Sequence, residues 1–408
     1  MTATTTAQGT GHEGAEPRTP YEPLRVGVLG AARIAELAIV KPALATGTRL
    51  VAIAARDQAR ASAFAAEHGV EQTLASYADV VSLPDVEVVY NPLPNALHGT
   101  WNLAAIDAGK HVLSEKPFAA DAEEAAEVAA AAHRRGLLVV EGFHYLYHPV
   151  TRRLHELLAS GDLGELVHVE TTLEIQDPGP RDPRWSLALA GGATMDLGCY
   201  SVHAQRVLAP WGGGEPELVS ARAGERPGEP GVDEWLEARL RFPSGATGVA
   251  RCHMASDHRQ LSYRIIGSRG EVLVTNFVEP HLDDRLIIQT PAGRHVEHHG
   301  TRSSYTYQLE AFTRAVREGT ALPIGVDDAV ANMRLIDACY MAAGLQPRPR
   351  RQTTSVRGTS PTAKGADRPV PGPMEALNPR EDESHGGTEE LPRGASGASG
   401  PVGGRCPA

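Results

Sequence analysis

Between Leu24 and Val140 the sequence alternates short, continuously apolar runs with longer alanine-rich stretches. The apolar runs are Arg25–Leu29, Leu50–Ala54, Val86–Tyr90, His111–Leu113 and Leu137–Val140. Runs without polar–apolar alternation are typical of strands buried on both faces of a parallel sheet. The stretches between them, where Ala, Leu and Glu favour helix, are Ile34–Ala45, Gln58–His68, Leu97–Ala108 and Ala122–His133. This order predicts right-handed β–α–β units and a doubly wound α/β domain.

A second pattern begins after Pro149. Thr151–Ala159 has the composition of one more helix, and from Leu166 onward polar and apolar residues alternate in short segments. These segments are LVHVETTLEI, ELVSARA, WLEARLRF, GVARCHMA, LSYRIIG, GEVLVTN and RLIIQT, and helices are expected near Tyr305–Glu318 and Asp327–Gly344. Alternation indicates strands with one face buried. We therefore predict an α+β domain with an open, mostly antiparallel sheet whose other face is solvated or forms an interface.

Glycine and proline, 42 and 30 residues in total, are concentrated at the two ends of the chain. Segments with few large apolar residues cannot bury enough surface to offset the entropy cost of ordering. We therefore predict disordered ends at residues 1–20 and 347–408. Between them we expect the doubly wound domain over residues 21–145 and the α+β domain over residues 146–346.

Charge and cysteine content exclude several classes of protein. The formal net charge of -11 argues against nucleic-acid binding, which needs a basic surface. We find no apolar run near the ~18 residues that span a bilayer, and the first residues do not resemble a secretory signal. The cysteines Cys199, Cys252, Cys339 and Cys406 form no CxxC pair. We therefore expect no disulfide framework, no metal site and a cytoplasmic location.

The first candidate binding site is the strand–turn–helix around Gly30-x-Ala32-x-x-Ala35, a dinucleotide-binding pattern in which alanine replaces two glycines. Small residues let the backbone approach a pyrophosphate, and the helix N-terminus favours its charge. The residues that we predict to bind a dinucleotide here are Gly30, Ala31, Ala32, Arg33 and Ile34. Ordinary tight packing between a strand and a helix would also need small residues.

The end of the second predicted strand indicates which dinucleotide binds. An acidic residue there would bind the ribose hydroxyl of NAD, but this chain has alanines followed by Arg56. A guanidinium group matches the charge and geometry of a 2′-phosphate. We therefore predict NADP(H) rather than NAD(H). The alternative is an exposed arginine next to Asp57, with no ligand.

The loop at residues 91–98 is the next candidate, because its prolines stop both strand and helix at the carboxyl edge of the sheet, where ligands of such folds bind. Pro92, Leu93, Asn95 and His98 are its predicted cofactor contacts. Asn95 could instead cap the next helix, and His98 could be an ordinary first-turn residue.

Two further motifs supply groups suited to catalysis. Lys116, in Glu115-Lys116-Pro117, follows the predicted strand at His111–Leu113, and its charge can lower the pKa of a neighbouring acid and hold a substrate hydroxyl. Asp196, Tyr200 and His203 are spaced i, i+4 and i+7, which places them on one face of a helix. The alternative is a core helix with a satisfied tyrosine, and we assign His203 a structural role.

Together these motifs resemble the glucose–fructose oxidoreductase/inositol dehydrogenase/MocA family. The resemblance covers about residues 22–346 and is carried by Glu115-Lys116-Pro117, by GGATMDLGCY and by EGFHYLYHP at residues 141–149. GAARIA in the first turn and Asp-x-x-x-Tyr are similar to the branch with dimeric dihydrodiol dehydrogenase and D-xylose dehydrogenase. Sugar-nucleotide ketoreductases also pair Lys with Tyr. Leu146, where branch members often have arginine, and the C-terminal tail depart from the family.

The resemblance implies hydride transfer between NADP(H) and a sugar, a dihydrodiol or a sugar-derived ketone. It implies that Glu115 and Lys116 contact the cofactor, that Lys116, Tyr200 and Asp196 are catalytic, and that these three and Trp185 contact the substrate. In reduction Tyr200 would protonate the carbonyl oxygen, with its pKa lowered by Lys116. The family also implies that residues 21–145 form an NAD(P)-binding Rossmann domain. It implies that residues 146–346 bind substrate and form a homodimer or homotetramer through the second sheet. An NAD-dependent glycoside hydrolase and a non-enzymatic sugar or cofactor sensor are the alternative functions.

Overall fold

The apolar runs of the first part form a five-stranded sheet in the computed structural model, which describes residues 21–351. The strands are β1 (Arg25–Leu29), β2 (Arg49–Ala54), β3 (Val88–Asn91), β4 (His111–Ser114) and β5 (Val139–Glu141). Their order is β2-β1-β3-β4-β5, and every neighbouring pair is parallel. Nearly all of their residues are buried, as coverage of both faces requires. The predicted doubly wound sheet is confirmed.

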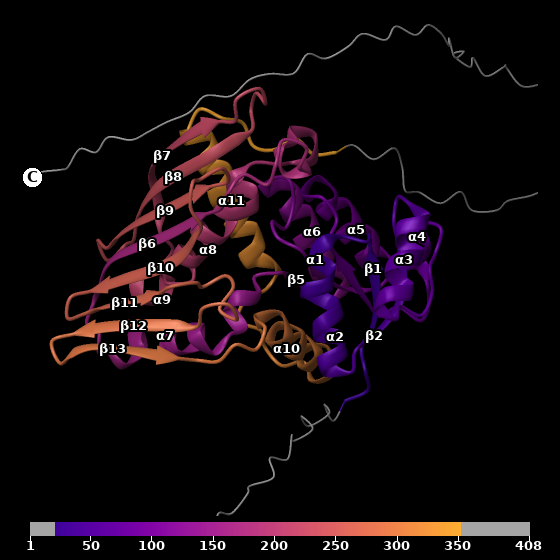
Figure 1. Ribbon diagram of the computed structural model, residues 1–408, viewed down its shortest axis with the longest axis horizontal. Helices are drawn as coiled ribbons and strands as arrows, with labels where there is room; N and C mark the ends of the chain where they lie inside the picture. The colour runs from indigo at the N-terminus through magenta and orange to yellow at the C-terminus, as the bar shows by residue number, and fades with distance from the viewer. Residues whose placement is uncertain (1–20, 352–408) are drawn as a thin grey trace, which may run out of the picture. The chain divides into compact units, whose positions relative to one another are not determined.

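Helices connect these strands and cover both faces of the sheet (Figure 1). They are α1 (Arg33–Ala35), the π-helical turn η1 (Glu36–Val40), α2 (Lys41–Thr46), α3 (Gln58–His68), α4 (Tyr77–Ser82), the 3-10 turn η2 (Asn95–Leu97), α5 (His98–Asp107) and α6 (Ala122–Arg135). The stretch predicted as one helix at Ile34–Ala45 is thus three consecutive helical pieces. Helix α4 was not predicted, because six residues are too few to show a helical period.

The second part of the chain builds an eight-stranded sheet in the order β13-β12-β11-β10-β6-β9-β8-β7. Its strands are β6 (Leu166–Glu174), β7 (Glu217–Glu225), β8 (Asp233–Arg241), β9 (Thr247–His253), β10 (Gln260–Gly267), β11 (Glu271–Val274), β12 (Arg285–Thr290) and β13 (Gly293–His298). The β6–β9 pair is parallel and the other pairs are antiparallel, as predicted. Strand β13 was missed, since this edge strand is almost entirely exposed and lacks an apolar face.

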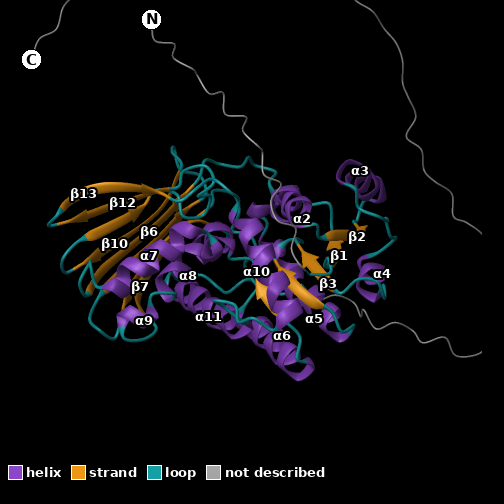
Figure 2. Cartoon of the chain, turned by 90° about the horizontal axis from the view of Figure 1, so that it is seen from below, coloured by secondary structure: helices purple, strands orange, loops and turns teal. Residues whose placement is uncertain are grey.

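The helices of the second part lie either against one face of this sheet, as α7 and α8 do, or nearer the parallel sheet, as α10 does (Figure 2). They are η3 (His144–Tyr147), α7 (Pro149–Ser160), η4 (Pro183–Trp185), η5 (Leu187–Leu189), the π-helical turn η6 (Thr194–Gly198), α8 (Cys199–Arg206), α9 (Ala209–Gly212), α10 (Ser304–Glu318) and α11 (Val326–Ala342). Alternate residues of β6, β8, β9 and β10 point toward these helices and are buried. The opposite face of the sheet is left without a covering layer in the described residues.

The two sheets share their hydrophobic packing. One cluster of buried side chains runs from Val112 in β4 to Ile265 in β10 and Met333 in α11. A second cluster joins Val26 in β1 to Phe312 in α10, so a late helix completes the core of the first sheet. The domain boundary near residue 145 stays a prediction, because packing crosses it on both sides.

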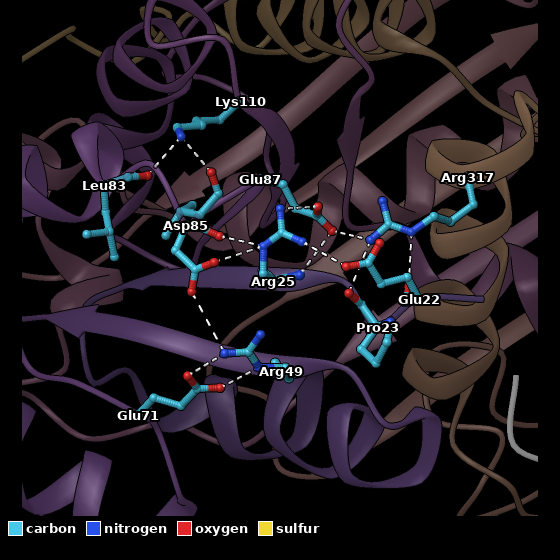
Figure 3. A network of polar contacts seen from close by, with 11 residues as sticks. Glu22, Pro23, Arg25, Arg49, Glu71, Leu83, Asp85, Glu87, Lys110 and Arg317 are labelled. Carbon is cyan, nitrogen blue, oxygen red and sulfur yellow. Dashed lines mark hydrogen bonds and ion pairs between the residues drawn. The ribbon is translucent and has the colours of Figure 1, made fainter.

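A polar network closes the amino ends of the parallel strands, opposite the edge where the strands end (Figure 3). Arg25 in β1 pairs with Glu87 (3.0 Å), which also accepts a hydrogen bond from Arg317 of α10. The buried ammonium group of Lys110 donates to the backbone oxygen of Val86 (2.5 Å). The contact of Glu87 with Arg317 fastens α10 to the first sheet at the end opposite the carboxyl edge.

The predicted disordered ends mostly lie outside the described residues. The C-terminal prediction needs one correction, because it began at residue 347. Arg348 is only 2% exposed, and Arg350 forms ion pairs with α6. Residues 347–351 are therefore part of the fold.

Candidate active site

The turn after β1 has the geometry that dinucleotide binding needs. Gly30 has φ 92°, which favours glycine, and its N–H donates to the backbone oxygen of Ala54 (2.7 Å). Ala31 and Ala32 follow in the turn, and helix α1 begins at Arg33. This N-terminus lies at the carboxyl edge of the sheet, where its N–H groups favour an anion.

The first turn of α3, after β2, brings one arginine, Arg60, to the same turn. Arg56 is exposed, and Asp57 caps α3 by accepting hydrogen bonds from the N–H groups of Ala59 (2.9 Å) and Arg60 (3.2 Å). The Arg60 guanidinium reaches back and donates to the backbone oxygen of Ala31 (2.9 Å). Arg60 was missed in the sequence, although its place in the first turn after β2 puts it beside Arg56.

The loop at residues 91–98 is held by its own side chains. Pro92 and Leu93 are buried. His98 is 1% exposed, and its ring nitrogens lie 2.6 Å from the backbone oxygens of Leu93 and Pro117. The Asn95 amide donates to the backbone oxygen of Ala190 (3.0 Å), across the crevice. The structure thus assigns these side chains to shaping the loop, and their contacts with a cofactor stay predictions.

Glu115 and Lys116 follow β4, and the Lys116–Pro117 bond is cis. The buried Glu115 carboxyl accepts a hydrogen bond from the Tyr90 hydroxyl (2.9 Å), and burial raises its pKa. Lys116 Nζ donates to the backbone oxygen of Asp196 (2.7 Å) and to its Oδ1 (3.1 Å). The same ammonium group lies 5.3 Å from the centre of the Tyr200 ring. The predicted catalytic side chains Lys116, Asp196 and Tyr200 are therefore neighbours.

Asp196 is held between two cations. Its Oδ2 accepts a hydrogen bond from Arg184 (3.0 Å), while Oδ1 faces Lys116. Burial raises the pKa of Asp196, but Lys116 and Arg184 more than offset this and hold the pKa below its usual value. Arg184 also pairs with Asp182 (2.9 Å), which pairs with Arg33 (3.1 Å). A series of ion pairs thus links Arg33, next to the turn after β1 (the predicted cofactor turn), to Lys116.

The Tyr200 hydroxyl has a histidine neighbour. It lies 3.1 Å from Nε2 of His144, whose Nδ1 lies 2.8 Å from the Ser304 hydroxyl. His144 stacks on Tyr305 at 3.7 Å, and burial, with Lys116 nearby, lowers its pKa well below 6.5. His144 is therefore neutral. It was not singled out in the sequence, because its partners lie 56 and 160 positions away.

One predicted detail of the tyrosine is wrong. Lys116 was expected to lower the pKa of Tyr200, but burial raises it well above 10. The ammonium group faces the ring and is bonded to Asp196, so it does not contact the phenol oxygen. Tyr200 is therefore a neutral phenol that can donate a proton.

The helix that carries Asp196 and Tyr200 also differs from the regular helix predicted. Its first turn, η6, is π-helical, and Asp196 lies within this turn while Tyr200 lies in α8. His203 is buried, stacks on Phe143 at 3.9 Å and lies 2.9 Å from Asp328. These contacts fit the structural role expected for His203.

Close packing explains the two glycines before this helix. A Cβ on Gly191 would lie 2.3 Å from the Arg184 backbone oxygen, and one on Gly192 would lie 2.0 Å from Asp233 Oδ1. Trp185, a predicted substrate contact, is 3% exposed, and the Arg226 guanidinium lies 4.3 Å from its ring centre. A substrate contact of Trp185 stays a prediction.

Two kinds of feature are absent from the described part of the chain. Residues 21–351 contain no cluster of three or more His, Cys, Asp or Glu side chains arranged to hold a metal ion. No helix in the same residues is long and apolar enough to span a bilayer.

Comparisons with known proteins agree with this architecture. Residues 24–143 match the family model described as "Oxidoreductase family, NAD-binding Rossmann fold", and residues 151–273 match the GFO/IDH/MocA C-terminal domain. The chain is 36% identical over 321 residues to D-xylose 1-dehydrogenase (NADP(+)) 2 of Haloferax volcanii, covering 78% of this chain and 96% of that protein. It is 36% identical over 209 residues to trans-1,2-dihydrobenzene-1,2-diol dehydrogenase of Sus scrofa, covering 51% and 61%.

A solved structure is similar over the same region. A 3-ketoreductase from Actinomadura kijaniata, crystallised with NADP and TDP-benzene, superimposes with a TM-score of 0.73 and 30% identity. The match covers 79% of this chain and 98% of the reductase. The chain therefore belongs to the GFO/IDH/MocA family of oxidoreductases.

Proposed function

We propose that this oxidoreductase transfers hydride between NADP(H) and a carbinol or carbonyl group of a sugar, a dihydrodiol or a sugar-derived ketone. The observation that carries the proposal is the meeting of Lys116, Asp196 and Tyr200 beside the cofactor turn, at the carboxyl edge of the parallel sheet. The substrate classes come from the relatives, one named for D-xylose, one for a dihydrodiol and one as a 3-ketoreductase.

The residues present fit NADP. The turn at Gly30 and the N-terminus of α1 would hold the pyrophosphate, with Glu115 near the ribose and nicotinamide end. Arg56 and Arg60 would hold the 2′-phosphate, because guanidinium groups form strong charge-assisted hydrogen bonds with phosphate oxygens. The bound nicotinamide supplies or accepts the hydride.

The protein's own groups handle the substrate oxygen. In the reducing direction Tyr200, a neutral phenol, gives its hydroxyl proton to the carbonyl oxygen as the carbon gains hydride. Lys116 orients that oxygen and stabilises its developing negative charge, while Asp196 orients the Lys116 ammonium group. Oxidation runs through the same positions in reverse, with Tyr200 receiving the proton.

Lys116→Met and Tyr200→Phe test the assignment. Each should lower turnover by about 100-fold or more, since general acid–base groups contribute on that scale, while the Kd for NADPH changes little. Lys41→Met, at an exposed lysine of α2, and Tyr147→Phe, outside the site, are the matched controls. Near-normal turnover in both test variants would refute the assignment.

A substrate screen tests the reaction class. Aldoses, dihydrodiols and sugar-nucleotide ketones would each be mixed with NADP+ or NADPH while the absorbance of the reduced cofactor is followed. Turnover of one class that is lost in Tyr200→Phe supports the proposal. Aglycone release from glycosides, with a cofactor that never leaves the protein, would instead support the hydrolase alternative.

We also propose a cytoplasmic homo-oligomer that pairs through the open face of the eight-stranded sheet. The face carries ion pairs that a second copy could share, such as Arg264 with Glu170 (3.3 Å), and half-buried Leu273 and Ile287. Cys199, Cys252 and Cys339 are free thiols, which fits a reducing compartment. Ile287→Asp should reduce the mass measured by light scattering to that of a monomer, and an unchanged mass would exclude this face.

A further inference from the structure

The last described segment of the chain buries an arginine far from solvent. The Arg348 and Asp233 side chains are both 0% exposed and are paired with each other. Arg348 Nη1 donates to the backbone oxygen of Gly231 (2.7 Å), and its guanidinium carbon lies 4.0 Å from the Tyr340 ring centre. The Tyr340 hydroxyl donates to Asp233 Oδ1 (3.0 Å). The terminal segment and α11 thus each supply one partner to the same buried carboxylate.

The other oxygen of this carboxylate reaches the catalytic helix. Asp233 Oδ2 accepts hydrogen bonds from both the backbone N–H and the hydroxyl of Thr194, each at 2.6 Å. Thr194 is the first residue of η6, and Asp196 follows two residues later. The Asp196 N–H donates to the Gly192 backbone oxygen (3.0 Å), and Gly192 leaves the space that Asp233 occupies.

We propose that Arg348 is a positioning residue for catalysis, acting through Asp233 and Thr194 on the place of Asp196 and hence of Lys116. The inference rests on the proposed function, in which Lys116 and Asp196 handle the substrate oxygen. Arg348 itself touches none of the reacting groups.

The physical reason is the cost of a buried charge. A carboxylate enclosed by protein is costly unless it is paired and hydrogen-bonded, and removing one partner of a buried pair leaves the other charge uncompensated. Without the guanidinium group, the buried Asp233 carboxylate loses its charge partner and is no longer held in place. This loss weakens its two hydrogen bonds to Thr194. The π-helical turn that starts there would shift, and Asp196 would shift with it.

The same segment offers a matched control. Arg350 pairs with Asp121 (2.6 Å), Glu123 (2.7 Å) and Glu127 (2.9 Å) on α6, and its side chain is 28% exposed. These contacts fasten the segment to the fold without touching η6. Loss of Arg350 therefore reports how much the attachment of the segment matters, apart from Asp233.

The experiment compares Arg348→Gln, Arg348→Lys and Arg350→Gln in the full chain. Folding is monitored by thermal unfolding, NADPH affinity by cofactor fluorescence, and kcat and KM on the substrate found by screening. We expect Arg348→Gln to lower kcat about 10-fold or more with a nearly unchanged Kd for NADPH, since small misplacements at an active site are costly. Arg348→Lys should recover part of kcat, and Arg350→Gln should keep it.

If Arg348→Gln does not fold, Tyr340→Phe serves in its place, because it removes the hydroxyl that bonds to Asp233 and keeps the ring beside Arg348. It should lower kcat by a few-fold. The inference is overturned by unchanged kcat in folded Arg348→Gln, or in Tyr340→Phe, or by equal losses in Arg350→Gln. If Lys116→Met is also fully active, the proposed function fails together with the inference about Arg348. If Lys116→Met is inactive, the proposed function stands and only the inference about Arg348 fails.

Discussion

At the tip of the Tyr200 side chain, the hydroxyl meets an imidazole and not an ammonium group. His144 is buried and neutral, with Ser304 on its other nitrogen, so the Tyr200–His144–Ser304 contacts form a short hydrogen-bonded chain behind the phenol. These hydrogen bonds fix the position of the Tyr200 phenolic oxygen. They also leave the Lys116 ammonium group free to face Asp196.

His144→Phe tests this arrangement. Phenylalanine keeps the stacking on Tyr305 but removes the polar partner of Tyr200, so the hydroxyl loses its fixed position. We expect kcat to fall about 10-fold while the unfolding temperature changes little, as measured by steady-state kinetics and thermal unfolding. His155→Phe, in α7, is the control. A variant with normal kcat would show that the phenol needs no partner.

Cofactor choice is a second question at this scale. Arg60 bonds to the cofactor turn itself, and Arg56 is exposed beside it. Hydrogen bonds to a charged group contribute about 1.5–3 kcal/mol, so Arg60→Ala should raise the KM for NADPH about 10-fold or more. The KM for NADH should change little in the same assay. Equal effects on both cofactors would contradict a 2′-phosphate site, and Arg49→Ala, paired with Glu71, is the control.

The candidate site residues that the sequence indicates stand in motifs, whereas residues whose contacts come from distant partners were missed. Lys116, Tyr200 and Asp196 are predictable because they stand at strand ends or at helical spacing. Arg348 and Asp233 lie 115 positions apart, and nothing near either residue indicates that they meet. The direction of the Tyr200 pKa shift was wrong for a related reason, since burial depends on what packs around the ring.

Among the elements, the buried strands were the easiest to predict, because continuous apolar runs leave few alternatives. Strand β13 was not predicted because it is an exposed edge strand, and α4 was not predicted because it is short. The π-helical turns η1 and η6 were not predicted, because each is a single turn within a helix that differs from an α-helix only in its hydrogen-bond spacing. Both turns border the candidate site, where local departures from regular structure are common.

Where helix α11 meets the start of α6, burial disfavours the charged form of an aspartate. Asp337 Oδ2 accepts a hydrogen bond from the Ala122 N–H (2.8 Å), and burial raises its pKa to about 6. The pKa of this aspartate in the unfolded chain is about 4. Its favourable contribution to the free energy of unfolding is therefore fully present below about pH 4 and is lost as the pH rises through about 6.

Asp337→Asn should therefore stabilise the fold at about pH 8 and not at about pH 4.5, because asparagine keeps the acceptor without the charge. Two pKa units correspond to about 2.7 kcal/mol, and partial solvent exposure reduces the expected gain to about 1 kcal/mol. Urea unfolding at both pH values measures it. Asp327→Asn, at an exposed position of the same helix, is the control. A gain that is equal at both pH values would contradict the explanation.

For the whole molecule, the described fold ends with the segment that holds Arg348 and Arg350. The D-xylose dehydrogenase relative matches 78% of this chain but 96% of its own length, so most of its length corresponds to the folded part. A chain ending after residue 351 should keep turnover within about twofold. A chain ending after residue 346 should lose about 10-fold or more, because it lacks the guanidinium group that compensates Asp233.

Kinetics and thermal unfolding of the two shortened proteins, beside the full chain, test this expectation. Comparable activity in both would mean that Asp233 is satisfied without Arg348. Low activity in the longer one would show that residues 352–408 contribute to the enzyme.

The packing of α10 against β1 also bears on synthesis at the ribosome. The first strand to emerge shares its apolar cluster with Tyr305, Leu309 and Phe312, which are made almost three hundred residues later. Domains usually fold in order as they leave the ribosome, at about 5–20 residues per second. At this rate, α10 is synthesised tens of seconds after β1 and α2, and until then the side of β1 and α2 that packs against α10 stays uncovered. The nascent Rossmann half therefore exposes an apolar face for which a chaperone can compete.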